Sequence, residues 1–434
     1  MTTPHRAVYI VDGARTPFLK MRGQPGALSA SDLAVQAGRA LLARFSFPPS
    51  ALDEVILGCM IPSADEANIA RVVALRLGCG KTVPAWTVQR NCASGMQAID
   101  SAARNIMLGK SDLVLAGGTE AMSRAPLLWN ASMVSWLAGL SASKTVFQKL
   151  KKIAQFRPSY LSPVAALLRG LTDPVVNLSM GQTAENVAHR FHINRTQMDE
   201  YAVLSHQRVM QAAEKKYFSE IVPVFDNKGN YFTADDGVRP DSSVEKLATL
   251  KPFFDKKWGN VTPGNSSQIT DGAAILLLAS SDAVEEYRLP VLAKITDIHW
   301  AGLNPAEMGL GPVHATVPLL KKNGLDRHDI DYWEINEAFA AQVLGCVAAF
   351  EDSPYCHELG LAAPFGKIDL ERLNVDGGAI AMGHPVGASG ARIILHLAHV
   401  LKREHGKRGV ATICIGGGQG GSALIENVSG GAAS

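Results

Sequence analysis

The sequence predicts an α/β protein built from two similar halves, and three observations lead to this prediction. Short apolar stretches of strand length alternate with longer stretches of helical periodicity along most of the chain. The 434 residues are 47% hydrophobic and include 40 glycines, which suits a large core with many tight turns. A series of elements near the N-terminus also recurs in the same order near the C-terminus. Strands that alternate with helices favour parallel βα units in each half.

The first copy of the series lies near the start of the chain. Residues 52–58 are expected to form a strand, and a later turn at Cys92 opens a helix through 98–108. The apolar stretch 113–116 is the next expected strand, and it ends at a pair of glycines. The order is therefore strand, reactive turn, helix, strand and glycine pair.

The second copy lies near the end of the chain. Residues 330–336 are expected to form a strand, the turn at His384 opens a helix through 391–401, and a strand ends at Ile415 before another glycine pair. Both helices begin beside a Ser-Gly dipeptide: Ser94-Gly95 and Ser389-Gly390. Because an ordered repeat indicates duplication, we expect the halves to pack side by side with the matching helix N-termini near a common site.

The region from about Arg124 to Leu250 breaks this rhythm, and we interpret it as an inserted lid-like domain. It includes a polar helical stretch at 183–216 and a stretch at 129–171 that mixes apolar and basic side chains. The second stretch is expected either to lie on a membrane surface or a partner, or to pack on the core as an ordinary amphipathic lid helix. The expected domains are the N-terminal half at 1–123, the inserted domain at 124–250, a return to the N-terminal half at 251–282, and the C-terminal half at 283–434.

Composition excludes several classes of protein. The net charge of +2 gives no global attraction to nucleic acid. The six cysteines are scattered, without a CxxC pair or zinc-like spacing, so we expect no metal site and a reducing, cytoplasmic compartment. The apolar run at 8–11 is expected to be a first strand rather than a signal peptide. Apolar stretches such as 273–279 are far shorter than the ~20 residues of a membrane span.

Two cysteines and a histidine at the ends of elements indicate acyl-thioester chemistry. Cys92 and His384 each lie on a glycine-tight turn, and the partial positive charge of a helix N-terminus is expected to favour a Cys92 thiolate. Cys414 ends a strand just before a run of three glycines. A thiol can act as nucleophile and a second thiol as proton donor. The alternatives are that the cysteines are small core residues and that the histidine merely caps a turn.

Two further features carry less information. Asn336 ends a strand and is either functional or a helix N-cap. The glycine-rich stretch 416–421 formally fits the GxGxxG pattern of dinucleotide-binding sites. Such a site needs a helix after the glycines, but residues 422–426 are expected to form a closing strand. A turn that brings backbone N–H groups near a substrate carbonyl is therefore favoured.

Taken together, four ordered motifs resemble the thiolase family. These motifs are residues 91–95, 336–339, 383–385 and 414–418. Residues 181–188 and 264–267 are also similar, and the resemblance extends from about Arg6 to Glu426. The long segment before Met180 and the stretch 351–372 resemble the long-chain 3-ketoacyl-CoA thiolases of fatty-acid β-oxidation. Asn336 departs from the histidine of that group, so the short-chain acetoacetyl-CoA type of biosynthesis stays as the alternative.

The resemblance implies a fold and a reaction. The fold would be a duplicated five-layer αβαβα core with an inserted loop domain, assembled as a homodimer or homotetramer. The enzyme would cleave 3-ketoacyl-CoA with coenzyme A to acetyl-CoA and a shortened acyl-CoA. Cys92 would take the acyl group, His384 would activate its thiol, and Cys414 would move the proton of acetyl-CoA. Asn336 would hold a water that forms one oxyanion hole with His384, and the N–H groups of Cys92 and Gly416 would form another.

The resemblance also implies binding residues and partners. Ser267, Met180 and Phe339 match positions that line the pantetheine tunnel, and Arg239 would meet the coenzyme A phosphates. Coenzyme A is a substrate, so no cofactor is implied, and an enoyl-CoA hydratase/3-hydroxyacyl-CoA dehydrogenase could be a partner. A decarboxylating ketoacyl synthase, a non-catalytic acyl-CoA-binding scaffold and a nicotinamide oxidoreductase are the alternatives; Cys414 argues against the first.

Overall fold

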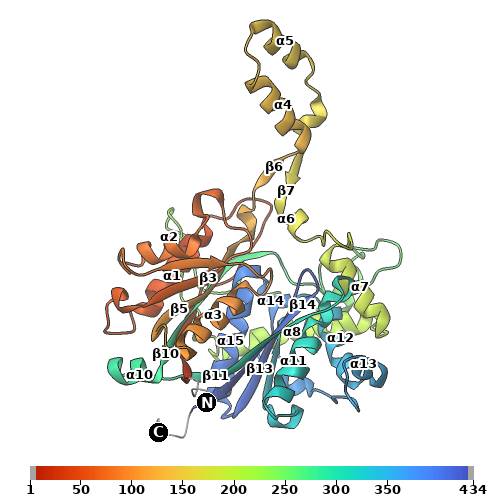
Figure 1. Ribbon diagram of the computed structural model, residues 1–434. Coiled ribbons are helices and arrows are strands. Elements are labelled where there is room, and N and C mark those ends of the chain that lie inside the picture. The colour runs from red at the N-terminus through yellow and green to blue at the C-terminus, as the bar shows by residue number, and fades with distance from the viewer. Residues whose placement is uncertain (1–5, 429–434) are drawn as a thin grey trace.

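A computed structural model describes residues 6–428, and it centres on one large mixed sheet (Figure 1). The expected domain ends at residues 1–5 and 429–434 lie outside the described part. Nine strands follow one path across the sheet, and the short β2 (Leu19–Lys20) pairs with one of them. The order along the path is β12 (Tyr332–Ile335), β13 (Arg408–Ile415), β14 (Gln419–Asn427), β11 (Ala293–Gly302), β1 (Val8–Arg15), β10 (Thr270–Ser280), β5 (Leu113–Ala121), β3 (Glu54–Gly58) and β4 (Ala85–Val88).

The strand pattern is duplicated, as the sequence predicts. In the N-terminal half, β1 pairs antiparallel with β10, β10 antiparallel with β5, and β5 parallel with β3. In the C-terminal half, β11, β14, β13 and β12 repeat the same order with the same directions. The two halves meet where β1 pairs antiparallel with β11 over residues 8–10.

The expectation of parallel units is wrong for most of the sheet. Only the outer pairs β3–β4, β3–β5 and β12–β13 are parallel. The physical reason is visible in the C-terminal half, where β13 and β14 are joined by the three-residue turn 416–418. A connection that short can only produce an antiparallel pair, because a parallel pair needs a crossover of a dozen or more residues.

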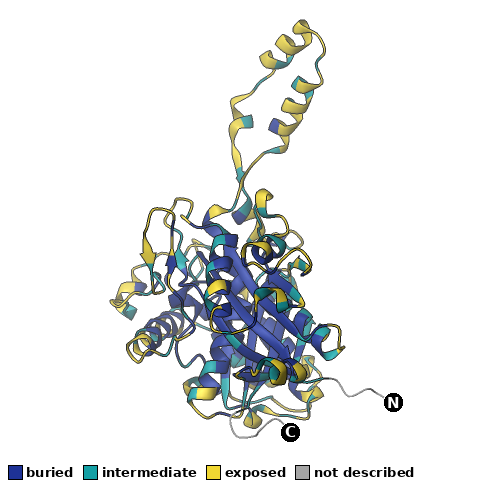
Figure 2. Ribbon diagram, turned by 90° about the vertical axis from the view of Figure 1, so that its left-hand side faces the viewer, coloured by how far each residue is buried: buried dark blue, intermediate teal, exposed yellow. Residues whose placement is uncertain are grey.

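Helices complete a five-layer arrangement. In the middle, α3 (Ser94–Met107) and α15 (Val386–Arg403) pack against each other and against strands of both halves. Met96 and Ile99 of α3 and Ile394 of α15 belong to the apolar core that the two helices share. The outer layers are α1 (Ala30–Leu42) and α2 (Ile69–Arg76) on the N-terminal half, and α11 (Gly311–Lys322) and α12 (Ala340–Glu351) on the C-terminal half. Figure 2 shows the strands in the middle of the body as buried, with exposed residues on the elements around them.

The expected inserted region divides into two parts with different surroundings. In the first part, the strands β6 (Leu127–Trp129) and β7 (Pro163–Ala165) pair antiparallel and carry α4 (Ala131–Ser141) and α5 (Val146–Ala154). We call residues 127–165 the projecting hairpin, because it extends well away from the body (Figures 1 and 2). Of the predicted stretch 129–171, residues 129–165 therefore do not pack on the core as a lid, whereas Leu167 and Leu171 at its end do.

The second part belongs to the body. α7 (Met180–Arg190) and α8 (Arg195–Glu214) share an apolar core with α11 and α12 of the C-terminal half. The sequence suggested one helical stretch over 183–216, but the chain turns between the two helices, where His192 has a φ of 55°. Asn194 then starts α8 with a capping box that includes Gln197. The remaining short elements of the body are α6 (Ala166–Gly170), β8 (Val224–Phe225), β9 (Tyr231–Phe232), α9 (Val244–Ala248), α10 (Ser281–Tyr287), α13 (Ser353–Glu358) and α14 (Ala379–Met382).

Candidate active site

Cys92 lies in the turn between β4 and α3, and local hydrogen bonds define that turn. Asn91 has a left-handed φ of 43°, a conformation that asparagine tolerates better than most residues. Its Nδ2 donates to the carbonyl oxygen of Gly416 at 2.7 Å. The Ser94 hydroxyl accepts from the backbone N–H of Arg90 at 2.9 Å and donates to the carbonyl oxygen of Asn91 at 2.7 Å. The turn is therefore tied to itself and to the glycine-rich segment after β13.

His384 lies in the matching turn before α15. Gly383 before it has a φ of 106°, which suits glycine, and the His384 N–H donates to the carbonyl oxygen of Gln268 at 3.0 Å. The Ser389 hydroxyl lies 2.6 Å from the ring Nδ1 and donates to the carbonyl oxygen of Pro385 at 3.1 Å. Because a hydroxyl has one proton, we assign the ring proton to Nδ1, which leaves Nε2 as an acceptor.

The ring of His384 is neutral and has one acceptor nitrogen without a partner among the described residues. Its Nε2 is buried and has no hydrogen-bond partner among the described residues. Burial, and then the charge of Arg392, lowers the pKa of His384 to about 3. The imidazole is therefore neutral near pH 7, and an unpaired buried ring nitrogen of this kind is uncommon in proteins.

Glycines allow the two reactive turns to approach each other. A Cβ on Gly95, in the first turn of α3, would lie 2.8 Å from the carbonyl oxygen of Gly387 in the first turn of α15. A Cβ on Gly390 would lie 2.7 Å from the backbone nitrogen of Met96. The repeated Ser-Gly dipeptides thus have two functions: the serines fix the turns, and the glycines let the helices cross at their N-termini.

Cys414 and Gly416 come to the same place from β13. The Gly416 N–H hydrogen-bonds to the Cys92 thiol and opposes the rise in its pKa. The pKa of Cys414 is raised well above its usual value, first by burial and then by the neighbouring thiols of Cys92 and Cys346. The structure therefore brings together Cys92, His384 and Cys414 on converging turns and strand ends, as the sequence predicts.

The state of the Cys92 thiol differs from the expectation. Burial raises the pKa of Cys92, and this effect exceeds the opposing hydrogen bond from Gly416. Cys92 packs against an apolar cluster made of Met122, Leu167 and Val386, and the charge of Glu120 adds to the rise in its pKa. A resting thiolate at the helix N-terminus is therefore not supported, and the nucleophile requires a base.

Asn336 lies directly after β12 and is fully buried. Neither its Oδ1 nor its Nδ2 has a hydrogen-bond partner among the described residues. The N-cap interpretation is wrong, because α12 begins at Ala340 and Phe339 occupies the cap position. Unpaired buried amide atoms are costly, so they mark a polar position that is available to a substrate or a water.

Glu337, which the sequence did not single out, fixes the segment that carries Asn336. Its buried carboxylate accepts hydrogen bonds from Tyr201 Oη at 3.0 Å, Ser205 Oγ at 2.6 Å and Asn374 Nδ2 at 3.1 Å. Two of these donors come from α8. No sequence signal pointed to this network, since its members are more than 30 residues from Glu337.

The residues expected to line the substrate tunnel lie together. A Cβ on Gly416 would lie 3.1 Å from Met180 Sδ, so this side chain reaches the glycine-rich turn. The Ser267 N–H donates to the carbonyl oxygen of Ala338 at 2.9 Å, next to Phe339. Phe339 packs edge to face on Phe254 with ring centroids 5.9 Å apart, and the sequence did not indicate Phe254.

Arg239 lies on the exposed surface beside other cations. Burial, and then the charge of Arg239, lowers the pKa of Lys20 and of His206, and the charge of Arg22 also lowers the pKa of Lys20. The backbone N–H of Arg239 donates to His206 Nδ1 at 3.1 Å. This local positive charge suits phosphate groups, although no contact places Arg239 against the reactive residues.

The glycine-rich stretch 416–421 forms the turn of the β13–β14 hairpin and the start of β14. No helix follows it, which confirms the prediction of a turn and excludes the dinucleotide-binding arrangement. Across residues 6–428, no group of three or more His, Cys, Asp or Glu side chains is arranged to hold a metal ion. In the same range, no helix combines the length and apolar character that crossing a bilayer requires.

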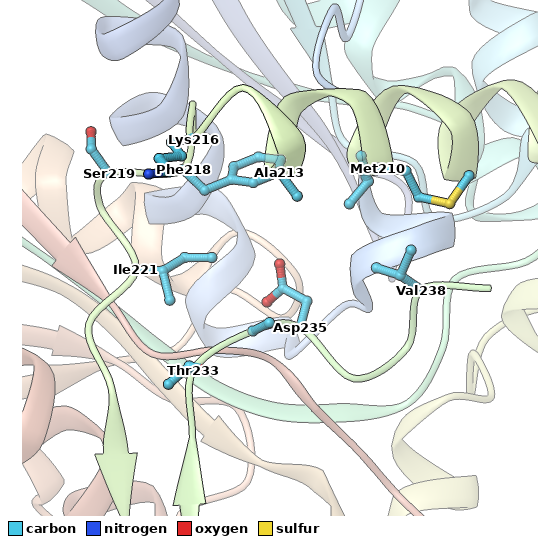
Figure 3. A pocket seen from close by; sticks show the side chains of 11 residues that line it. Met210, Ala213, Lys216, Phe218, Ser219, Ile221, Thr233, Asp235 and Val238 are labelled. Atoms are coloured by element: carbon cyan, nitrogen blue, oxygen red, sulfur yellow. The ribbon is translucent and has the colours of Figure 1, made fainter. Parts of the chain in front are cut away.

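A separate cavity of about 600 Å³ opens beside the C-terminal end of α8 (Figure 3). Met210, Phe218, Ile221 and Val238 line it together with Asp235. The Asp235 carboxylate is engaged by the buried Arg15 guanidinium through two hydrogen bonds of 2.7 and 2.9 Å. None of the predicted site residues lines this cavity.

Family comparisons agree with this geometry. Residues 8–282 match the family model described as "Thiolase, N-terminal domain", and residues 289–427 match "Thiolase, C-terminal domain". The chain is 39% identical over 429 residues to "3-ketoacyl-CoA thiolase, mitochondrial" of Rattus norvegicus, covering 98% of this chain and 99% of the relative. It is 36% identical over 423 residues to "Trifunctional enzyme subunit beta, mitochondrial" of Bos taurus, covering 97% and 88%.

A solved structure has the same fold. It is human mitochondrial 3-ketoacyl-CoA thiolase in complex with CoA, with a TM-score of 0.83 and 36% sequence identity. The match covers 98% of each chain.

Proposed function

This chain belongs to the thiolase family, an acyltransferase family that cleaves 3-ketoacyl-CoA with coenzyme A, and we propose that Cys92, His384 and Cys414 carry out the reaction here. The observation that supports this assignment is the convergence of the two thiols and the neutral imidazole at the first turns of α3 and α15 and the end of β13. β-Oxidation of fatty acids fits the named relatives.

The first half-reaction forms an acyl-enzyme. His384 Nε2 takes the Cys92 proton, and the sulfur attacks the C3 carbonyl of 3-ketoacyl-CoA. The C2–C3 bond then breaks, the shortened acyl group stays on Cys92 as a thioester, and Cys414 donates its proton to the carbanion of acetyl-CoA. The oxyanion on C3 would be stabilised by the N–H groups of Cys92 and Gly416.

The second half-reaction releases the product. The thiol of coenzyme A gives its proton to the Cys414 thiolate and attacks the thioester. The acyl group moves to coenzyme A, and Cys92 recovers its proton from His384. Asn336, with its unpaired amide, would hold a water that stabilises the thioester oxygen of acetyl-CoA together with His384. The two thiols and the imidazole supply the nucleophile, acid and base, so the proposed reaction uses coenzyme A only as a substrate and needs no further cofactor.

Acyl transfer to Cys92 can be tested directly by mass spectrometry. After incubation with acyl-CoA, the wild-type protein should carry one acyl group on the peptide that contains Cys92, and Cys92→Ser should carry none. Cys356→Ser, at a buried cysteine on α13, is the matched control and should be acylated normally. Acyl mass on Cys414, or on Cys92→Ser at the wild-type rate, would overturn the assignment.

Coenzyme A binding is proposed for the residues next to this site. Met180, Ser267 and Phe339 would line the pantetheine path, and Arg239 would meet the phosphates through the positive surface beside Lys20. Arg239→Gln should raise the KM for coenzyme A several-fold and leave kcat nearly unchanged, because a surface phosphate contact acts on binding. An unchanged KM would remove Arg239 from the site.

The projecting hairpin supports a proposal about docking. Its inner face is ordered: Trp136 packs on Phe156 with ring centroids 5.0 Å apart, and the Trp136 indole N–H donates to the carbonyl oxygen of Lys152 at 2.8 Å. Met133 is buried there, but many of the hairpin's large apolar side chains are open to solvent, with Val146 and Phe147 of α5 more than 70% exposed. A helix that combines exposed apolar and basic side chains suits an anionic membrane surface or a partner protein.

We therefore propose that the hairpin holds the enzyme on a membrane or on a β-oxidation partner such as a hydratase/dehydrogenase. One relative is by name a subunit of a larger enzyme, which supports a partner. Flotation with anionic vesicles should show salt-sensitive binding. Reversal to Glu at four hairpin lysines should abolish it without changing the cleavage of a soluble short-chain substrate: Lys144, Lys149, Lys151 and Lys152. The control reverses four exposed lysines of the body: Lys81, Lys110, Lys228 and Lys407. Wild type that neither floats nor co-purifies with a dehydrogenase would exclude docking.

The assembly, compartment and chain-length preference are also proposals. A homodimer or homotetramer is supported by the sheet edge, where β4 has no second strand partner within residues 6–428 and presents the partly exposed Trp86. Six free cysteines support a reducing compartment such as the cytoplasm. Light scattering would give the oligomeric state, and cleavage rates across ketoacyl chain lengths would distinguish the long-chain type from the short-chain acetoacetyl-CoA type.

A further inference from the structure

Glu120 is a buried carboxylate that the proposed reaction does not use. It lies next to the end of β5 and is fully inaccessible to solvent. No Lys, Arg or His of the described chain forms an ion pair with it; its hydrogen bonds come instead from backbone groups and a thiol. An acidic group is expensive to bury without a cation unless several donors compensate it.

The donors to Glu120 come from the segment that follows β3. The backbone N–H of Met60 donates to Oε2 at 2.8 Å, and that of Ile61 donates to Oε1 at 3.1 Å. The Cys59 thiol donates to Oε1 at 3.4 Å. These hydrogen bonds fix three consecutive residues on the end of β5. The side chains of Met60 and Ile61 pack against the same apolar cluster as Cys92, which consists of Met122, Leu167 and Val386.

Glu120 also contacts the first turn of α15. The backbone N–H of Gly387 lies near its carboxylate and acts to lower its pKa, and a Cβ on Gly387 would lie 2.8 Å from Glu120 Oε2 and 2.5 Å from the carbonyl oxygen of Thr119. A negative group at a helix N-terminus is stabilised by the helix dipole. Gly387 is three residues after His384, so one carboxylate holds both the segment beside the nucleophile and the turn that carries the base.

We propose that Glu120 is a positioning residue for acyl transfer, which locks the 59–61 segment and the first turn of α15 around Cys92 and His384. It has a second effect through its charge, which disfavours the Cys92 thiolate. The other titratable groups around Cys92 and Glu120 are His384 from the turn before α15, Cys414 from β13 and Cys59 after β3. Burial raises the pKa of Cys92 first and the charge of Glu120 adds to it, so removing that charge should lower the pKa of Cys92 while the larger effect of burial stays.

Two substitutions separate position from charge. Glu120→Gln removes the negative charge. It also keeps one acceptor oxygen but replaces the other with an NH2 donor, so the backbone N–H of either Met60 or Ile61 loses its acceptor. Glu120→Asp keeps the charge but withdraws the carboxylate by one methylene. Both should acylate Cys92 about 10- to 100-fold more slowly than wild type in single-turnover experiments, because small misplacements of reacting groups have effects of this size.

The pH dependence of Cys92 alkylation by iodoacetamide distinguishes positioning near the thiol from a general loss of stability. Its midpoint should move to lower pH in Glu120→Gln and stay near the wild-type value in Glu120→Asp. The control is Asp53→Asn, since Asp53 accepts the backbone N–H groups of Asp112 and Leu113 at the opposite end of β5, at 2.7 and 2.9 Å. This control should change neither the acylation rate nor the midpoint.

Several outcomes would overturn the proposal. A wild-type rate of Cys92 acylation in both Glu120 variants would exclude the positioning role. An equal loss of acylation rate in Asp53→Asn would show that the effect results from a general loss of sheet stability. An unmoved midpoint in Glu120→Gln would exclude the role of the charge. If Glu120→Gln does not fold, the acylation rate of Glu120→Asp and amide hydrogen exchange in the wild type test the proposal instead. Fast exchange of the Met60 and Ile61 amides would contradict the claim that Glu120 locks the 59–61 segment.

Discussion

Removal of the Ser389 hydroxyl should slow acyl transfer by between several-fold and about 150-fold. In the wild type, this hydroxyl lies 2.6 Å from His384 Nδ1 and donates to the carbonyl oxygen of Pro385. Ser389→Ala leaves the buried Nδ1–H without an acceptor, which costs about 1–3 kcal/mol. The ring can escape this cost by moving the proton to Nε2 or by rotating, and either response removes the acceptor that the mechanism requires.

The magnitude follows from that cost. A factor of ten in rate corresponds to about 1.4 kcal/mol, so 1–3 kcal/mol predicts a loss between several-fold and about 150-fold. The assay is the single-turnover acylation of Cys92 by 3-ketoacyl-CoA, followed by quenched-flow mass spectrometry. Folding would be checked by thermal unfolding.

A matched control separates this effect from the general loss of a buried hydroxyl. Ser422, on β14, is buried and hydrogen-bonded to the hydroxyls of Thr316 and Thr412 at 2.9 and 2.6 Å. Ser422→Ala should lower the stability to a similar extent without slowing acylation. If Ser389→Ala acylates within twofold of the wild type, the assignment of the proton to Nδ1 and the role of Ser389 are both wrong.

Three further predictions concern other parts of the structure. Cys414→Ala should still acylate Cys92 but should lose exchange of the acetyl-CoA methyl protons in deuterated water, measured by NMR; normal exchange would refute its role as the acid. Burial lowers the pKa of His396, but the carboxylates of Glu220 and Asp376 outweigh this effect and raise the pKa to about 9. Protonated His396 should therefore contribute about 3 kcal/mol to the free energy of unfolding, in full below pH 6.5, and this contribution should be lost as the pH rises through 9. Urea unfolding should show this loss in the wild type, and an equally steep loss in His396→Gln would contradict it. Gly387→Ala should abolish activity, because its Cβ would lie 2.5 Å from the carbonyl oxygen of Thr119; wild-type thiolysis by a folded variant would exclude this tight contact.

Much of the fold and the core of the site could be predicted from local sequence. The two Ser-Gly dipeptides indicated helix starts, and the structure places α3 and α15 there. Cys92 and His384 could be singled out because a reactive side chain on a glycine-tight turn is a local pattern. The direction of the strands could not be predicted in the same way, because it depends on which strands pair across the sheet.

Other parts of the site depend on contacts between distant segments. The Glu337 carboxylate is fixed by Tyr201, which is 136 residues away in sequence, and Glu120 by residues about 60 positions earlier. The higher pKa of Cys92 likewise results from burial among side chains of several segments. The function of a charged or hydroxyl side chain cannot be predicted from the sequence until the residues that it contacts are known.

The sequence by itself determined the duplicated pattern, the family and the three reactive side chains. These features rest on residue type and short spacing, since only glycine permits the close turns and only thiols and imidazole supply this chemistry near neutral pH. The tertiary structure alone decided the antiparallel directions, the projecting position of residues 127–165, the absence of a partner for the Asn336 amide within residues 6–428, and the rise in the pKa of Cys92. These properties depend on burial and on partners brought together by long-range packing, which local sequence does not encode.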